Sequence, residues 1–159
     1  VHAARGALLG SALMLLIWRR PSFDEKIDGI VYAVFVSLGF AAVENILYVS
    51  EGGYQTALVR AITAVPAHAL FGVAMGYYLG IARMYRELRR GYLLRAFLVP
   101  WILHGIYDFI LMVEVNWLLF MFLPFLVYLY LAGLKKIRMH SESSIFRPAE
   151  EDEEPTGIP

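Results

Sequence analysis

The chain has 159 residues, of which 59% are hydrophobic and only 18% are charged. Soluble domains average ~45–50% apolar residues, so this composition excludes an ordinary soluble domain and indicates an integral membrane protein. The formal net charge is zero and there is no cysteine, which gives no indication of nucleic-acid binding and excludes disulfides and a thiolate metal site.

Successive apolar runs predict an all-α, polytopic transmembrane helix bundle with about five spans. A spanning helix needs ~20 apolar residues, and the continuous rather than alternating runs argue against a membrane β-barrel. The first run is short and is typical of the end of a truncated helix, whereas the other four are long enough to cross a bilayer. The expected ranges are 7–18, 28–50, 58–81, 92–113 and 117–134.

Polar connections separate these runs. Pro21 breaks the first connection, and the Gly-Gly pair in the stretch EGGYQ is expected to end the second run in a loop. The chain becomes soluble in character from Lys135 onward and ends in the acidic stretch PAEEDEEPTGIP, a composition that favours disorder. The sequence therefore predicts a transmembrane domain over residues 1–136 and a cytoplasmic, disordered tail over residues 137–159.

Lysines and arginines gather at alternate connections. The first connection, the third connection and the end of the last run are basic, whereas the two remaining connections have few positive charges. The basic residues are Arg19, Arg20, Lys26, Arg83, Arg86, Arg89, Arg90, Arg95, Lys135, Lys136 and Arg138. Because basic loops remain on the cytoplasmic side, the pattern predicts a cytoplasmic C-terminus.

Ionisable side chains interrupt the apolar runs at Glu44, His68, His104 and Asp108. Each such group at membrane depth costs ~2.5–3.5 kcal/mol on insertion scales, and therefore marks a functional-site hypothesis. A rise of about 1.5 Å per residue, counted from the expected span ends, places all four in the outer half of the membrane near one level. The sequence therefore predicts that they converge around one cavity.

Several kinds of chemistry fit these four residues. Two histidines and two carboxylates could hold a divalent metal with a position open for water. Alternatively, Glu44 could act as a general base on water while the histidines stabilise an oxyanion. Each residue taken alone also has a structural explanation as an interhelical hydrogen-bond partner. His104 and Asp108 are spaced i, i+4, so they face the same side of one helix.

Three segments closely resemble the PrsW family of bacterial intramembrane proteases, in the same order and with the same spacing. They are FDEKIDGIVYAVFVSLGFAAVENILYV, RAITAVPAHALFGVAMGYYLGIAR and LHGIYDFIL. The resemblance covers residues 23–136. It implies a peptidase of the bacterial cytoplasmic membrane that cleaves a membrane-tethered protein, such as an anti-sigma factor, with a divalent metal such as zinc or with a glutamate alone.

The resemblance also implies which residues form the site. The family's Glu-Asn motif, second-helix histidine and His-x-x-x-Asp motif are all present. Glu44, His68 and His104 are the implied catalytic residues and the candidate metal ligands. The implied supporting residues are Asn45, Arg60 and Asp108.

The family's paired-glutamate motif, Glu-Glu-x-x-Lys, has no counterpart in this sequence. It should fall near residues 4–9, where the sequence reads HAARGALLG without a carboxylate. If those glutamates supply the base or a metal ligand, the chain as it stands is expected to be inactive. Two interpretations stay open: a protease that is truncated or altered at this end, and a non-catalytic relative that binds transmembrane segments. An ion- or proton-coupled transporter is less favoured, because the sequence has no inverted repeat.

Overall fold

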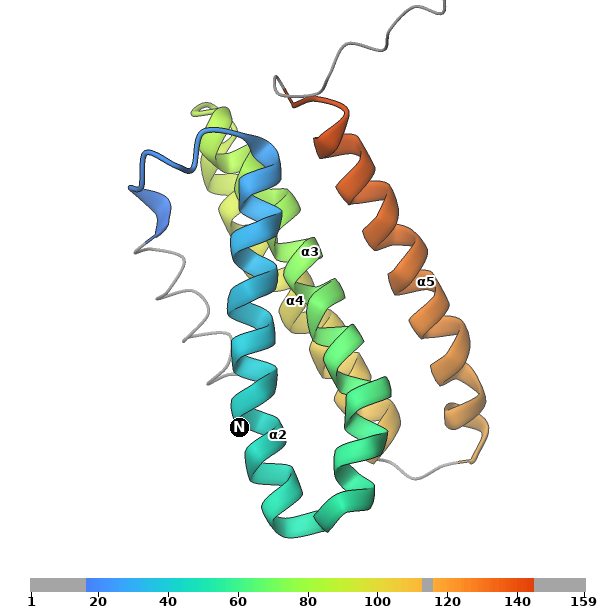
Figure 1. Ribbon diagram of the computed structural model, residues 1–159. Coiled ribbons are helices and arrows are strands. Elements are labelled where there is room, and N and C mark those ends of the chain that lie inside the picture. Colours follow the sequence, from blue (N-terminus) through green and yellow to red (C-terminus); the bar gives the residue numbers. More distant parts are fainter. Residues whose placement is uncertain (1–16, 113–115, 145–159) are drawn as a thin grey trace, which may run out of the picture.

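The computed structural model describes residues 17–112 and 116–144, and these form long helices without any β-strand (Figure 1). The helices are α2 (Lys26–Ile62), α3 (Ala64–Met84), α4 (Arg89–Met112) and α5 (Asn116–Ser141). Each contains a segment long and apolar enough to cross a membrane. The all-helical prediction is confirmed, with four candidate spans in the described residues rather than about five. The expected first run, 7–18, lies almost entirely outside those residues.

Helix α2 bends sharply at Gly53, whose φ of 71° lies in the left-handed region. Glycine adopts this conformation without the steric cost that a side chain would bring. After the bend the chain remains helical to Ile62 and turns back toward α3 (Figure 1). In place of the predicted loop at EGGYQ, one non-helical residue, Gly53, separates two helical segments, so the glycine pair ends the first segment as expected. The following span begins at Ala64 instead of residue 58.

Close contact between glycines joins α2 to α3. Gly72, Gly76 and Gly80 recur every four residues on α3, and Gly29 on α2 lies opposite Gly76 and Gly80. A Cβ atom at Gly72 would lie 2.7 Å from the Cα atom of Val34, and one at Gly29 would lie 2.6 Å from the carbonyl oxygen of Gly76. Small residues allow helix backbones in membranes to approach this closely. The glycine contact therefore fixes the register of α2 against α3.

Replacing Gly76 with alanine is expected to destabilise the bundle by ~1–3 kcal/mol, the usual cost of overpacking. The added Cβ atom would overlap the backbone of Gly29 and Ile30. Unfolding in detergent, followed by circular dichroism, measures the change. Gly39→Ala is the matched control, because that helical glycine has no atom within 4 Å of the added Cβ. Equal loss in both variants would contradict a special role for the glycine contact.

Helix α3 is the centre of the bundle and α5 is its least buried member. In the most apolar window of each candidate span, 56% of the residues of α3 are buried, against 11% for α5. Figure 1 shows α5 beside the other helices, continuing through residue 136 to Ser141. The division between residues 136 and 137 stays a prediction, and most of the expected tail, residues 145–159, lies outside the described residues.

Candidate active site

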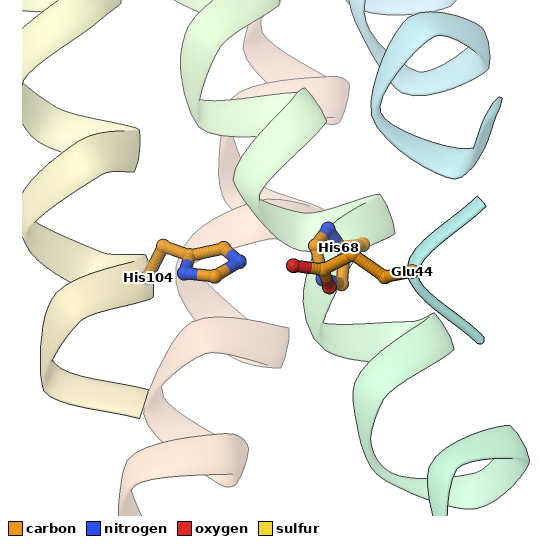
Figure 2. Close-up of side chains that lie close together, drawn as sticks. All are labelled: Glu44, His68 and His104. Carbon is orange, nitrogen blue, oxygen red and sulfur yellow. The ribbon is translucent and has the colours of Figure 1, made fainter. Parts of the chain in front are cut away.

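Three buried side chains converge from three helices at one point in the bundle (Figure 2). Glu44 comes from α2, His68 from α3 and His104 from α4, and they are 5%, 2% and 9% exposed. One carboxylate oxygen and one nitrogen from each ring all lie within 4.8 Å of one another. The Nε2 atom of His68 is 3.2 Å from the Oε2 atom of Glu44. The structure thus brings together the three residues that the sequence analysis placed first.

The register of α2 and α3 explains why Glu44 meets His68. His68 lies one helical turn before Gly72, so it shares the face of α3 that packs against α2. On α2, the Ser37 hydroxyl donates a hydrogen bond of 2.6 Å to the backbone carbonyl oxygen of His68. Glu44 follows Ser37 by two helical turns on the same face. The glycine contact therefore sets the position of both side chains.

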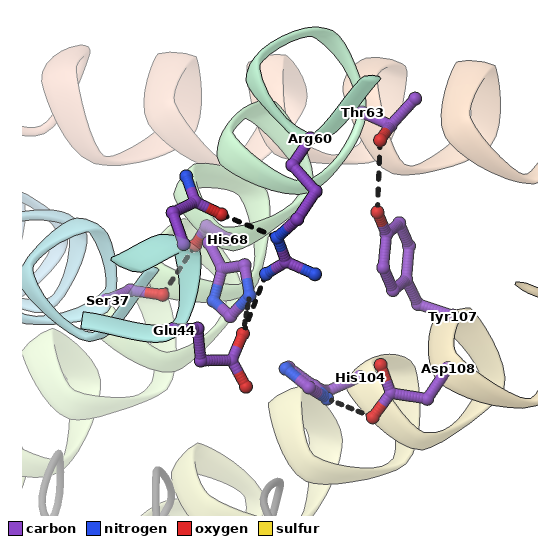
Figure 3. Close-up of polar contacts among 9 residues, drawn as sticks. Ser37, Glu44, Arg60, Thr63, His68, His104, Tyr107 and Asp108 are labelled. Atoms are coloured by element: carbon purple, nitrogen blue, oxygen red, sulfur yellow. Dashed lines mark hydrogen bonds and ion pairs between the residues drawn. The ribbon is translucent and has the colours of Figure 1, made fainter. Parts of the chain in front are cut away.

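Arg60 reaches Glu44 because α2 folds back after its bend (Figure 3). Its Nη2 atom donates to Oε2 of Glu44 at 3.2 Å, and its Nε atom donates to Oδ1 of Asn45 at 2.6 Å. The guanidinium carbon lies 4.1 Å from the centroid of the Tyr48 ring. The Glu44 carboxylate is therefore paired with a cation, and Asn45 and Tyr48 hold that cation in place.

His104 is buried, yet neither of its ring nitrogens makes a hydrogen bond. Its Nδ1 atom makes an ion-pair contact of 3.1 Å with Oδ2 of Asp108, without forming a hydrogen bond (Figure 3). The side chain of Asp108 is 37% exposed. Asp108 thus lies beside the three buried residues rather than among them. Buried polar atoms without a partner usually cost ~1–3 kcal/mol, so the Nε2 atom of His104, which has no hydrogen-bond or ion-pair partner in the described part of the chain, indicates a site for a ligand.

Sequence reasoning did not single out Phe71, Thr63 or Tyr107, which line the same site. The Phe71 ring lies 5.7 Å from that of His68 and 5.4 Å from that of His104. The Tyr107 hydroxyl donates to Oγ1 of Thr63 at 3.3 Å (Figure 3). The only available signal was spacing, because Phe71 and Tyr107 each follow a site histidine by three residues and share its helix face.

The three donors suit a divalent metal such as zinc. Two imidazole nitrogens and one carboxylate oxygen form a donor set that catalytic zinc sites use, with a fourth position open. At the usual bond lengths, tetrahedral donors lie about 3.3 Å apart, and the Glu44 and His68 atoms are already 3.2 Å apart. The Nε2 atom of His104, which has no hydrogen-bond partner, offers the remaining lone pair.

The bundle thus places a buried Glu-His-His donor set that could hold a divalent metal among helices apolar enough to cross a membrane. Residues 8–133 match the family model of PrsW family intramembrane metalloproteases. Proteins named Protease PrsW from Bacillus subtilis, Geobacillus kaustophilus and Oceanobacillus iheyensis are 49%, 46% and 44% identical over 79%, 77% and 83% of the chain. The chain belongs to the PrsW family, which confirms the resemblance found in the sequence.

The chain spans 58%, 54% and 61% of the length of those three relatives, respectively. The match begins at residue 8, within the stretch where the paired-glutamate motif is expected, and that stretch lies outside the described residues. The candidate site residues, together with Asn45, Arg60 and Asp108, all fall inside the matched range. No solved structure matches the chain.

Proposed function

We propose that this chain carries the catalytic centre of an intramembrane endopeptidase that cleaves a membrane-tethered protein. The observation that carries the proposal is the approach of Glu44, His68 and His104 to within 4.8 Å of one another, inside candidate membrane spans. Three ionisable groups buried together at that depth are expensive unless they have a function. Membership of a protease family supports the same conclusion.

The three residues would divide the work between binding and proton transfer. A divalent metal, when bound by Glu44, His68 and His104, would polarise the scissile carbonyl and provide a nucleophilic water at neutral pH. In the alternative mechanism without metal, Glu44 takes the proton from water and the two histidines donate hydrogen bonds to the developing oxyanion. In both mechanisms Arg60 positions the Glu44 carboxylate.

The test is cleavage of a labelled, single-span protein by the full-length protein in reconstituted vesicles, with an anti-sigma factor as the first substrate. We expect shortened products. If a chelator stops their formation and added zinc restores it, the result would select the metal mechanism. Stable binding without products would favour the non-catalytic alternative. Proton or ion flux without products would favour the transporter. With zinc present, binding without products or ion flux without products would overturn the proposed protease activity.

We also propose that the basic end of the bundle faces the cytoplasm. Lys26, Arg83 and Arg89 meet at that end, where Arg83 donates to the carbonyl oxygen of Phe23 and Arg89 to that of Ala82. Basic residues at membrane ends favour the cytoplasmic side. This orientation, in a bacterial cytoplasmic membrane, puts the C-terminus in the cytoplasm and the candidate active site in the outer half.

Reporter fusions test this orientation directly. Fusions after Arg90 and after Arg138 are both expected to be active in the cytoplasm, because each follows a basic cluster. A fusion after Gly52, just beyond the far end of the candidate span Lys26–Ser50, is the control and is expected to report the periplasm. A periplasmic signal from either of the first two fusions would contradict the orientation.

A further inference from the structure

A second polar site lies at the opposite end of the bundle from the candidate active site. A cavity of about 270 Å³ opens there, and Lys26, Tyr77, Tyr85, Tyr92 and His140 form much of its lining. Lys26 precedes Glu44 by eighteen residues on α2, which corresponds to about 27 Å along a helix. Lys26, Tyr92 and His140 lie in terminal turns of α2, α4 and α5, and Tyr85 directly follows α3. The cavity therefore lies at a membrane–water interface.

One lysine, Lys26, lines the cavity, and a second, Lys136, lies against its Tyr77 wall. The Nζ atom of Lys26 lies 5.3 Å from the centroid of the Tyr85 ring, and that of Lys136 lies 4.1 Å from the centroid of Tyr77. Aromatic rings attract such cations but carry no net negative charge. The positive charge of the cavity is thus held in place without being neutralised by the rings.

No carboxylate is among the described residues that line the cavity, and two of those at the same end have other partners. Glu142 accepts a hydrogen bond of 2.6 Å from Arg138, and Glu25 accepts one of 2.6 Å from the Ser144 hydroxyl. In the described part of the chain, Lys26 and Lys136 take part in none of the salt bridges. The cavity therefore presents positive charge that an anion from outside the protein can neutralise.

His140 makes one wall of the cavity rigid. It is 4% exposed, its ring stacks on Tyr77 at 4.4 Å with an angle of 16° between the planes, and its Nε2 atom lies 3.0 Å from the Tyr77 carbonyl oxygen. With the proton on Nε2, this contact is a hydrogen bond that ties α5 to α3. The wall next to both lysines is therefore formed before any ligand binds.

We propose that this cavity binds the headgroup of one anionic phospholipid, with the phosphodiester held by Lys26 and further attracted by the positive charge of Lys136 against the Tyr77 wall. Basic pockets between transmembrane helices recognise acidic headgroups in this way, and tyrosine is favoured at the same depth. The volume is just below the ~300–1,000 Å³ usual for drug-sized ligands, which suits a headgroup. The tyrosine hydroxyls supply further hydrogen-bond donors. Free phosphate shares this chemistry, but lipid phosphates already lie at the interface where the cavity opens.

Lipid retention measures the proposed binding. The protein is reconstituted in nanodiscs that contain equal phosphatidylglycerol and phosphatidylcholine, extracted into mild detergent with 0.5 M salt, and weighed by native mass spectrometry. We expect preferential retention of one phosphatidylglycerol. Lys26→Gln and Lys136→Gln are each expected to reduce that preference about fivefold, the usual effect of one basic residue on an anionic lipid. High salt suppresses weak contacts at exposed residues, whereas partly buried charges are screened less.

The matched control removes two exposed positive charges at the same end, in Lys135→Gln/Arg86→Gln, and is expected to retain the lipid. If the control and Lys26→Gln/Lys136→Gln lose phosphatidylglycerol equally, the retention depends on general surface charge, and the proposed site is overturned. No preference for phosphatidylglycerol would also overturn it, as would displacement of the lipid by millimolar inorganic phosphate. If the double variant does not fold, lipid retention by the two single variants decides the question. Lys26→Arg/Lys136→Arg keeps both positive charges and is expected to retain the lipid as the wild type does.

Discussion

Glu44→Gln is expected to abolish cleavage by the full-length protein, with a loss of ~100- to 10,000-fold, the usual contribution of a general base. The amide has almost the same shape, but it can neither accept a proton from water nor serve as an anionic ligand. We expect the loss in the catalytic rate rather than in substrate binding. The measurement is the rate of product formation in reconstituted vesicles at saturating substrate.

The structure changes what this variant is expected to do to stability. From the sequence alone, removal of a charge at membrane depth should stabilise the protein. In the structure, however, Glu44 is the counter-charge of Arg60, whose side chain is only 15% exposed. Glu44→Gln leaves that cation without its anion, although the bond to Asn45 and the Tyr48 ring remain. We therefore expect a loss of ~1–3 kcal/mol in the free energy of unfolding.

Two further variants separate chemistry from stability. Glu44→Gln/Arg60→Gln removes both charges, so its stability is expected to return toward that of the wild type while activity stays absent. Glu87→Gln removes an exposed carboxylate at the other end of the bundle and is expected to change neither quantity. Activity recovered in the double variant would contradict a chemical role for Glu44 and leave it only the role of pairing with Arg60.

The sequence predicted the helical class and the four described spans, because runs of apolar residues are an unambiguous signal. It did not predict that a helix resumes directly after Gly53, whose own backbone is not helical. Glycine pairs usually end helices, and only the packing of residues 54–62 back toward α3 reveals a kink. That kink matters for the site, because it brings Arg60 to Glu44.

Within the site, the sequence could name the residues but not their arrangement. Ionisable groups in apolar runs identified Glu44, His68 and His104, since burial of each alone is unfavourable. Depth alone placed Asp108 with them, although in the structure it lies at the side and is partly exposed. Phe71 could not be distinguished from ordinary core residues, because packing aromatics and site-lining aromatics have the same composition and spacing.

His68→Ala and His104→Ala are each expected to lower the affinity of this chain for zinc more than ~100-fold. Residues that only hydrogen-bond to a metal-binding side chain usually cost ~10–100-fold when replaced. Each of the two variants removes one nitrogen from the donor set around Glu44. Asp108→Asn is expected to cost only about tenfold, because Asp108 approaches His104 without a well-aligned bond. The measurement is competition against a fluorescent zinc chelator with the purified chain in detergent, so it does not depend on protease activity.

His140→Ala is the matched control for these variants, because His140 is buried in the same bundle but lies at its other end, against Tyr77. Its zinc affinity is expected to equal that of the wild type. Circular dichroism establishes that each variant is folded, since His68 is 2% exposed and its removal leaves a buried space. Unchanged zinc affinity in His68→Ala and His104→Ala, or an equal loss in His140→Ala, would contradict a metal site at Glu44, His68 and His104. Such a result would leave the mechanism in which Glu44 acts on water without a metal.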